Sequence, residues 1–404
     1  MRNNIFELTT EELQSIALAL QKKIEEGLEK DDMEILCVPT HISPRAKEEI
    51  NNGNVLALDW GGTNFRAAIV KFTDGIPEII EIKEKMLSAK ETVGYKQEDL
   101  FREMASLISK LEKLDEKVTQ IGYCFSYPAK CELNGDAILV RWTKGIDIPE
   151  MIDKPVGEPL MAYLNDQLKD KVKFNNIVVI NDTVACLFGG RSNAGYNSYL
   201  GLIVGTGNNM ASEMRLDKIG KMKSKYSGSI PVNLESGNFN PPYLTVIDNL
   251  VDAMSNNRDR QRFEKAISGK YLGDIFKMIF MYEKIKSSDK NKQDFDAEDL
   301  SKILTDNPCN FSEEKIDVAK QICERSAKLV AASITGLVQV LVKQDSKTRK
   351  IGLAVDGSVF WKTPKYKECV EEELKILLPN DVSVTILPKM ADPNLIGSAI
   401  AALS

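Results

Sequence analysis

An aspartate followed by a glycine turn is the feature of this sequence with the clearest chemistry. An apolar run at 55–58 leads into the turn, which reads Asp59, Trp60, Gly61, Gly62, Thr63 and Asn64. Glycine adopts positive φ easily and lets a backbone approach a ligand, so such a turn can present N–H groups to a phosphate. The aspartate can hold Mg²⁺, directly or through water. Taken alone, the stretch is equally compatible with an ordinary hairpin turn, and the Gly-Lys-Ser/Thr of a P-loop does not follow it.

Two further glycine turns follow apolar runs later in the chain. The first comes after 200–204 and reads Gly205, Thr206 and Gly207, and the second comes after 351–355 and reads Asp356, Gly357 and Ser358. Each of these turns alone is weak evidence for nucleotide binding. Together, the three turns fit a nucleotide clamped between two halves of a protein, with two turns at its phosphates and the third near its adenosine.

A candidate general base follows the buried-looking strand predicted at 177–180. Asn181 and Asp182 come directly after these four apolar, β-prone residues. The carboxyl end of a strand is where open α/β sheets place ligand groups, so Asp182 could accept the proton of a reacting hydroxyl. The alternative is that Asp182 only caps a helix whose first turn starts at Thr183.

The elements that must position these residues alternate between strands and helices. Thr9 or Thr10 can cap a first helix at 9–30, with Glu12 supporting its first turn. Strands are predicted near 55–60, 66–72, 78–84, 119–126, 137–141 and 177–180. Further helices are predicted at 97–113, 157–169, 256–284, 312–343 and 395–403. Gly336 lies inside one of them, and a close approach to the nucleotide or to a neighbouring strand could explain it.

Composition excludes several classes of protein. The chain has 404 residues, of which 43 % are hydrophobic and 28 % charged, which is typical of a globular protein large enough for two domains. The net charge of −6 argues against nucleic-acid binding as the main task. Seven cysteines form no Cys-x-x-Cys, and no apolar run reaches the roughly 20 residues that span a bilayer. We therefore expect reduced thiols, a cytoplasmic location and no membrane span. The single histidine, His41, cannot form a zinc site with the scattered cysteines.

From about Val55 to about Phe360 the chain resembles the hexokinase family, the eukaryotic-type sugar kinases of the actin-like ATPase superfamily. Residues 58–66 and 205–209 resemble its two phosphate turns, and 355–358 resemble its adenosine turn. Its sugar-binding and catalytic motifs are matched by 122–128, 142–145, 181–184, 233–237 and 261–269. The family's C-terminal Ser-Gly-Lys-Gly-Ala-Ala is absent, however, and the unrelated segment 392–399 stands in its place. Ser236 also stands where tryptophan is common.

The resemblance implies an α/β fold with two lobes, each with a ribonuclease-H-like core, and an active site in the cleft between them. By position, 51–180 would form the small lobe, with 389–404 returning to it. The large lobe would be 181–388, with 1–50 packing on it.

The resemblance also implies a set of site residues. The sugar would be bound by Ser126, Thr143, Lys144, Asn181, Asp182, Asn209, Glu235 and Glu264. Asp182 would be the catalytic base, and Lys144 would also stabilise charge on the transferring phosphoryl group. The nucleotide would be bound by Asp59, Gly61, Gly62, Thr63, Asn64, Arg66, Gly205, Thr206, Gly207, Asp356, Gly357 and Ser358. Asp59 would be the Mg²⁺ carboxylate, whereas Arg66 could equally be a strand arginine facing solvent.

The implied activity is ATP-dependent phosphorylation of a hexose, first of all glucose, at the 6-hydroxyl, with closure of the lobes on the sugar. A kinase for N-acetylglucosamine, mannose or fructose is the alternative within this class, and a non-catalytic sugar sensor is the alternative outside it. ROK-type glucokinases are disfavoured because their cysteine-rich zinc segment is absent. The expected partners are the hexose, ATP and Mg²⁺, with neither nucleic acid nor membrane, in a monomer or homodimer.

Overall fold

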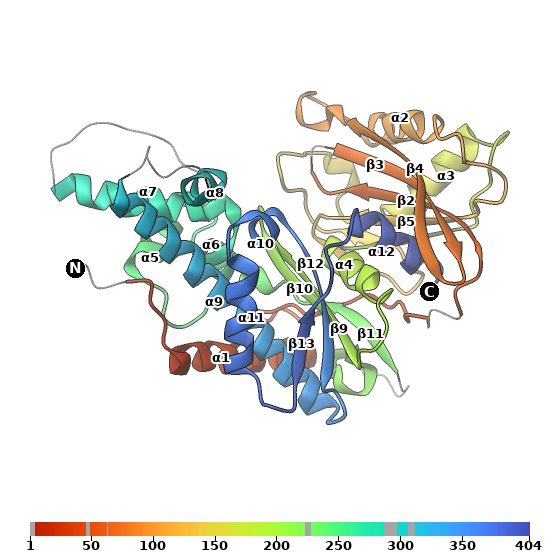
Figure 1. Ribbon diagram of the computed structural model, residues 1–404. Helices are drawn as coiled ribbons and strands as arrows, with labels where there is room; N and C mark the ends of the chain where they lie inside the picture. The colour runs from red at the N-terminus through yellow and green to blue at the C-terminus, as the bar shows by residue number, and fades with distance from the viewer. Residues whose placement is uncertain (1–4, 46–48, 63, 223–227, 287–296, 306–311) are drawn as a thin grey trace.

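Two β-sheets, each covered by helices, form the two lobes of the protein in the computed structural model (Figure 1). The structure describes residues 5–45, 49–62, 64–222, 228–286, 297–305 and 312–404. The predicted two-lobed α/β architecture is therefore correct.

The first lobe is built on a five-stranded sheet with the order β4-β3-β2-β5-β8. Its strands are β2 (Gly53–Trp60), β3 (Asn64–Thr73), β4 (Ile76–Met86), β5 (Gln120–Phe125) and β8 (Asn176–Ile180). Strands β2 and β3 pair antiparallel across the first glycine turn, as expected for a hairpin rather than a P-loop, while β2, β5 and β8 run parallel. A small hairpin, β6 (Ala129–Cys131) and β7 (Ala137–Leu139), lies beside them.

Helices cover both faces of this sheet. α2 (Gln97–Ile108) and α3 (Gly157–Gln167) contact each other and the sheet, and α12 (Pro393–Ala402) returns from the far end of the chain to pack on β2 and β5. The helix predicted at 97–113 is shorter than expected, because the chain turns after Ile108. The C-terminal return of the chain to this sheet agrees with the prediction, although the lobe bounds themselves stay a prediction.

The second lobe is built on a six-stranded sheet with the order β1-β11-β10-β9-β12-β13. Its strands are β1 (Val38–Pro39), β9 (Ser198–Val204), β10 (Asn208–Arg215), β11 (Ser229–Asn233), β12 (Lys350–Asp356) and β13 (Ser383–Ile386). Its helices are α1 (Thr10–Glu29), α5 (Val246–Met254), α6 (Arg262–Ile267), α7 (Gly269–Lys286), α8 (Ala297–Thr305), α9 (Glu313–Gln344), α10 (Ser358–Lys362) and α11 (Tyr366–Leu377). Helix α4 (Asp182–Gly190) lies between the two lobes (Figure 1). Short 3₁₀ turns occur at Ser88–Lys90, Pro149–Met151, Leu216–Lys218, Gly220–Met222 and Ser236–Asn238.

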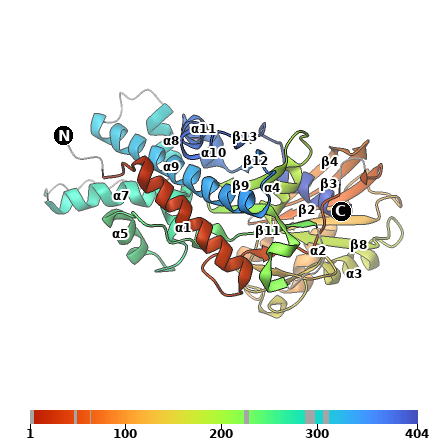
Figure 2. The ribbon, with the colours of Figure 1, turned by 90° about the horizontal axis from the view of Figure 1, so that it is seen from below.

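The first helix of the chain packs along α9 (Figure 2). It begins with the predicted capping box, in which Thr9 accepts from the Glu12 N–H and Glu12 accepts from the Thr9 N–H. A Cβ on Gly336 of α9 would lie 2.5 Å from the carbonyl oxygen of Ala17. Gly336 therefore allows a close contact between two helices, and the prediction of a neighbouring nucleotide or strand is wrong.

Helix α9 is the core helix of the second lobe. By length and composition it is apolar enough to cross a membrane, but 78 % of this apolar stretch is buried inside the protein, as expected for a core helix. Its apolar side chains thus cover the sheet and the neighbouring helices.

The single helical region predicted at 256–284 is correct only in part, because the chain is helical from Arg262 onward but as two separate helices. Helix α5 ends earlier, at Met254, and α6 and α7 are separate helices that meet at Ser268. Asp259 and Gln261 have φ of 62° and 51°, a left-handed conformation that interrupts a right-handed helix.

Candidate active site

Asp182 is placed by a helix cap at the end of β8. The Oδ1 atom of Asn181 accepts the N–H of Thr183 at 2.9 Å, so Asn181 is the residue that caps α4. Asp182 is the first residue of the helix, is only partly buried, and accepts a hydrogen bond from Thr183 Oγ1 at 3.2 Å. The alternative in which Asp182 serves as the cap is therefore wrong.

Helix α4 is held tightly between elements of both lobes. A Cβ on Gly201 of β9 would lie 2.4 Å from the carbonyl oxygen of Thr183, and one on Gly397 of α12 would lie 1.8 Å from that of Ala185. The absence of side chains at these two glycines lets α4 lie directly against β9 and α12. The position of Asp182 is thus fixed by backbone packing on both sides.

Lys144 connects the sugar-binding signature to the first glycine turn. Its backbone has φ of 59°, and its Nζ donates to the carbonyl oxygens of Gly61 at 2.6 Å and Ser126 at 2.8 Å. The ammonium also lies 5.3 Å from the ring centre of Tyr127. Thr143 precedes it in the same loop, and its carbonyl oxygen accepts the N–H of Ile146 at 3.2 Å. The four predicted positions Gly61, Ser126, Thr143 and Lys144 therefore belong to one connected structure.

A chain of amides orients two of the sugar residues of the second lobe. Asn209 Nδ2 donates to Asn233 Oδ1 at 2.7 Å, and Asn233 Nδ2 donates to Glu235 Oε1 at 2.8 Å. Glu235 itself has a left-handed backbone with φ of 58°, which turns its side chain out of the line of β11. Asn233 was not among the predicted site residues, although it stands two positions before Glu235 in the same motif.

Glu264 lies against the second glycine turn. Its Oε2 accepts the N–H of Asn208 at 3.1 Å, and a Cβ on Gly207 would lie 2.8 Å from the same oxygen. A predicted sugar carboxylate and a predicted phosphate turn are thus in direct contact.

Burial and neighbouring charges shift the pKa values of the two glutamates of the second lobe. Burial raises the pKa of Glu235, and the charges of Asp182 and Glu264 raise it further against the hydrogen bond from Asn233. Burial also raises the pKa of Glu264, while the Asn208 N–H and the charges of Lys270 and Lys144 oppose this. Lys144 belongs to the first lobe and Glu264 to the second, so charges from both lobes act on this carboxylate.

Asp59 and Arg66 form an ion pair beside the first turn. Asp59 is 6 % exposed, and burial raises its pKa, although the adjacent Arg66 opposes this. Arg66 donates to Asp59 Oδ2 through Nε at 3.0 Å and to Asp392 Oδ1 through Nη1 at 2.6 Å. Arg66 is therefore not a solvent-facing arginine, and its guanidinium is shared by two carboxylates; its part in phosphate binding stays a prediction. Asp392, in the divergent C-terminal segment, was not predicted in the site.

Asp59 fits the binding of Mg²⁺ together with substrate phosphates. No cluster of three or more His, Cys, Asp or Glu side chains that could enclose an ion occurs in the described part of the chain. Mg²⁺ is commonly held by one or two carboxylates with waters and phosphate oxygens. Arg66 occupies Oδ2 of Asp59, while Oδ1 has a long contact of 3.4 Å from Asn394 Nδ2. A single carboxylate oxygen thus remains for the ion or for its bound water.

The glycines of the first two turns have ordinary φ angles, so what they contribute is the absence of a side chain. Among the predicted glycines, Gly357 has a positive φ, of 114°, whereas Gly61, Gly62, Gly205 and Gly207 do not. A Cβ on Gly357 would lie 2.2 Å from the carbonyl oxygen of Val204, so the second and third turns touch. Asp356 ends β12, Gly357 follows it, and Ser358 begins α10.

The structure does not support a phosphate role for the two predicted residues that follow Gly62. Thr63 lies outside the described residues. The amide of Asn64 donates to Glu84 on β4 instead of facing the turn.

Lys270 lies beside the second turn and was also missed. The N–H groups of Gly269 and Lys270, at the start of α7, donate to the carbonyl oxygens of Gly205 at 2.7 Å and Thr206 at 3.3 Å. The signal in the sequence was a glycine and a lysine directly after the Glu264 segment.

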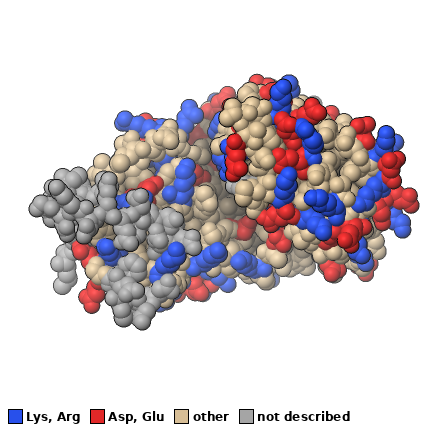
Figure 3. Space-filling view, turned by 90° about the horizontal axis from the view of Figure 1, so that it is seen from above, with Lys and Arg blue, Asp and Glu red and all other residues tan. Residues whose placement is uncertain are grey.

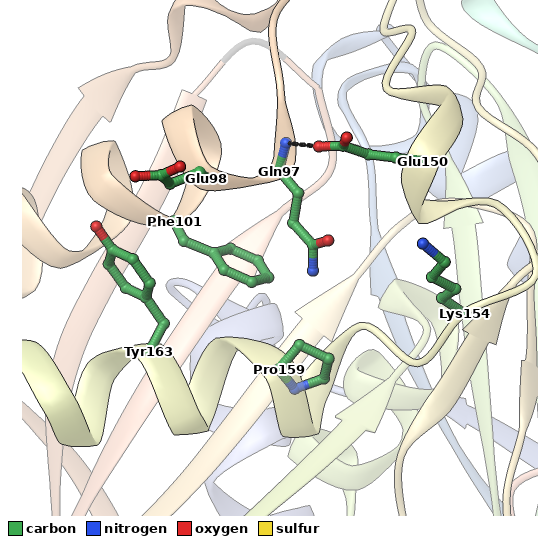
Figure 4. A pocket seen from close by; sticks show the side chains of 7 residues that line it. All are labelled: Gln97, Glu98, Phe101, Glu150, Lys154, Pro159 and Tyr163. Carbon is green, nitrogen blue, oxygen red and sulfur yellow. Dashed lines mark hydrogen bonds between the residues drawn. The ribbon is translucent and has the colours of Figure 1, made fainter.

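Cavities large enough for a ligand must be distinguished from the site itself. A shallow pocket of about 400 Å³ lies between α2 and α3, where Phe101 and Tyr163 are among the lining residues and the N–H of Gln97 donates to Glu150 (Figure 4). It contains none of the predicted residues. A cavity of about 20 Å³, enough for one water, adjoins Asn181, Asn233 and Glu235. From above, the surface is hollowed between the lobes, and charges of both signs are mixed over the rest of the face (Figure 3).

Comparisons with known proteins cover almost the whole chain. Two family models, both described as Hexokinase, match residues 3–192 and 199–404. Hexokinase-1 of Spinacia oleracea is 31 % identical over an alignment of 401 positions, and this alignment covers 87 % of this chain and 79 % of the relative. Hexokinase-1 of Saccharomyces cerevisiae is 29 % identical and covers 99 % of this chain and 90 % of its own length.

Solved structures share the fold. A hexokinase from Schistosoma mansoni complexed with glucose has a TM-score of 0.79 at 24 % identity, with 99 % of this chain and 96 % of that chain covered. A ROK family glucokinase from Streptomyces griseus, in complex with glucose and AMPPNP, has a TM-score of 0.54 at 17 % identity, with 87 % and 99 % covered. The two-lobed fold with its glycine turns and interlobe carboxylates, together with these matches along the chain, shows that the protein belongs to the hexokinase family of ATP-dependent sugar kinases.

Proposed function

We propose that the protein transfers the γ-phosphoryl group of ATP to the 6-hydroxyl of a hexose, with glucose as the expected substrate. The observation that carries this proposal is the contact between the sugar residues and the second glycine turn, where Glu264 accepts the Asn208 N–H and abuts Gly207. The bound glucose of the Schistosoma mansoni relative and the glucose and AMPPNP of the Streptomyces griseus protein support the same pair of substrates.

In this proposal the sugar is bound by polar groups that are already oriented. Glu235 and Glu264 accept hydrogen bonds from sugar hydroxyls, and the amides of Asn181 and Asn209 and the hydroxyl of Thr143 pair with the remaining ones. Asn233 holds Glu235 in place through its 2.8 Å hydrogen bond. Each hydroxyl that loses water thereby finds a partner, which a buried polar group requires.

Asp182 then acts as the base. Its carboxylate is free of the capping role, since Asn181 has taken it, and it can accept the proton of the attacking hydroxyl. Lys144 brings positive charge to the side of the cleft where the phosphoryl group is transferred. Asp59 would hold Mg²⁺, which would neutralise the negative charge on the phosphate oxygens.

Sugar binding is proposed to close the lobes. The sugar residues come from both lobes, with Ser126, Thr143 and Lys144 on one side and Asn209, Glu235 and Glu264 on the other. A ligand that bridges both sets stabilises the closed form by its higher affinity for that form. Closure then completes the site for a hexose, whereas water alone cannot drive it.

One coupled assay tests the activity. Purified protein with Mg²⁺-ATP is expected to release ADP only when glucose, mannose, fructose or N-acetylglucosamine is added, and the order of kcat/KM identifies the preferred sugar. A protein that binds a sugar in calorimetry but releases no ADP with any of the four would instead be a sugar sensor.

Small-angle scattering tests closure separately. The radius of gyration is expected to decrease when saturating hexose is added without nucleotide. Superimposable curves with and without hexose would contradict closure and leave the activity itself unaffected.

A further inference from the structure

A buried ion cluster lies behind α6, the helix that carries Glu264, and the proposed chemistry does not use it. At its centre, Asp252 of α5 and Lys265 of α6 are each 2 % exposed. Lys265 Nζ donates to Asp252 Oδ1 at 2.6 Å and to the carbonyl oxygen of Asn257 at 2.8 Å. Arg262 Nη1 adds a contact to Asp252 Oδ2 at 3.3 Å.

Helix α6 needs contacts of this kind to keep its place. It has six residues, far fewer than a helix needs to be stable alone in water, and no side chain caps its N-terminus. The segment before it passes through left-handed residues at Asp259 and Gln261. Asp252 also fixes this segment, because both of its carboxylate oxygens accept the N–H of Asp259 at 3.1 Å.

Lys265 and Glu264 are neighbours on this short helix and point in different directions from its axis. Successive helical residues point about 100° apart, so a fixed Lys265 also fixes the direction of Glu264. The apolar side chains Phe263, Ala266 and Ile267 hold the helix against the core, but apolar contacts have little directionality. Two hydrogen bonds also reach α6 from other elements, since the Phe263 N–H donates to the Phe239 carbonyl at 2.8 Å and Ser326 Oγ donates to the Ile267 carbonyl at 2.9 Å. The ion cluster adds a buried, directional restraint on the side next to Glu264. A misplacement of about 1 Å in a binding site can cost roughly a hundredfold in activity.

We propose that Asp252 is a positioning residue for hexose binding, which holds α6 through Lys265 so that the Glu264 carboxylate faces the sugar. The inference rests on the proposed function, because it takes Glu264 to be a ligand of the hexose.

A second buried ion pair, which also involves α5, provides a matched control. Asp248 lies one turn before Asp252 and is 4 % exposed. Its carboxylate accepts from Arg325 Nη1 at 3.0 Å and Nη2 at 2.8 Å. Arg325 belongs to α9, so this pair joins α5 to α9, whereas the Asp252 pair joins α5 to α6. Loss of either pair should lower stability, but only loss of the Asp252–Lys265 pair should also alter the sugar site.

The experiment compares the hexose Kd, measured by calorimetry with glucose, with kcat, KM and the melting temperature. The variants are Asp252→Asn, Lys265→Met, the double variant of both, Asp248→Asn as control and Glu264→Gln as reference. All titrations are made at a temperature where circular dichroism shows each variant to be folded. The double variant leaves no lone buried charge, which keeps the test valid if a single variant does not fold.

We expect Asp252→Asn and Lys265→Met to weaken glucose binding and raise its KM at least tenfold, with kcat within about threefold of the wild type. The double variant should have a higher melting temperature than either single variant but should bind glucose no more tightly than they do. Asp248→Asn should have a lower melting temperature than the wild type, with a glucose Kd within twofold of the wild type. A double variant with wild-type Kd, or equal losses of affinity in Asp252→Asn and Asp248→Asn, would overturn the proposal. If Glu264→Gln weakens binding while the Asp252 and Lys265 variants do not, this inference alone fails. If Glu264→Gln also binds normally, the assignment of the sugar site fails with it.

Discussion

Replacing Gly207 by alanine should weaken hexose binding even though Gly207 belongs to a phosphate turn. The added Cβ would lie 2.8 Å from Glu264 Oε2, so the carboxylate must move by roughly half an ångström or more to restore an ordinary contact. That movement stretches the hydrogen bond that Oε2 accepts from the Asn208 N–H, now 3.1 Å long. Gly207 has no positive φ, so the backbone itself accepts alanine and the effect is confined to the contact.

The size of the effect follows from the ligand that is disturbed. A hydrogen bond to a charged acceptor is worth about 1.5–3 kcal/mol, and about 1.4 kcal/mol corresponds to a factor of ten. We therefore expect Gly207→Ala to raise the Kd for glucose by about ten- to a hundredfold in calorimetry without any nucleotide.

Gly62→Ala is the matched control for this measurement. No atom lies within 4 Å of a Cβ built on Gly62, and this residue also lacks a positive φ. Its Kd for glucose should therefore stay at the wild-type value. A Gly207→Ala protein with a Kd within twofold of the wild type would refute the argument that the phosphate turn supports the sugar carboxylate.

Three further predictions concern the base, the pH dependence and the first phosphate turn. Asp182→Ala should lower kcat by about 10²–10⁴ with little change in glucose Kd, and a variant that keeps more than about a tenth of wild-type kcat would exclude Asp182 as the base. Burial holds the pKa of Glu235 and of Glu264 above the ordinary 4.5, so the folded protein binds these protons more tightly than the unfolded chain. As pH falls from the raised values towards 4.5, these two groups should make the free protein more stable while glucose affinity falls, because a protonated carboxyl is a weaker acceptor. Thermal melts and titrations should show both slopes, and the Glu235→Gln, Glu264→Gln double variant should reduce them, while the raised pKa of Asp59 continues to contribute to the stability slope. Asp392→Asn removes one of the two carboxylates that pair with Arg66, which leaves the guanidinium freer to bind phosphate. The KM for Mg²⁺-ATP should therefore fall by up to about fivefold, because the pair is partly exposed and weak. An unchanged or higher KM would show that Arg66 does not act on the phosphates.

Much of the site could be predicted because its residues lie next to strong local signals. The strand at 177–180 fixes where Asn181 and Asp182 emerge, and the hairpin of β2 and β3 fixes the first turn. The division of labour between Asn181 and Asp182 could not be read from the sequence, because both are good caps and only the backbone angles decide between them.

The errors arose where distant segments meet. Asp392 pairs with Arg66 across more than 300 residues of chain, and Gly336 meets Ala17 across a similar separation. The break between α5 and α6 depends on left-handed residues that are not glycine, and Asp252 stabilises them through tertiary contacts that local propensity does not contain.

The return of α12 to the five-stranded sheet has a consequence for the order of folding during synthesis. Gly122 of β5 accepts the helix so closely that a Cβ there would lie 2.0 Å from the carbonyl oxygen of Ser398. The strands of this sheet leave the ribosome some 200 residues before α12, so one apolar face of the sheet waits uncovered while the second lobe is made. Helix α1 waits in the same way for α9. Nascent chains of this protein should therefore depend on chaperones until α12 emerges, since uncovered apolar faces and late long-range contacts favour aggregation.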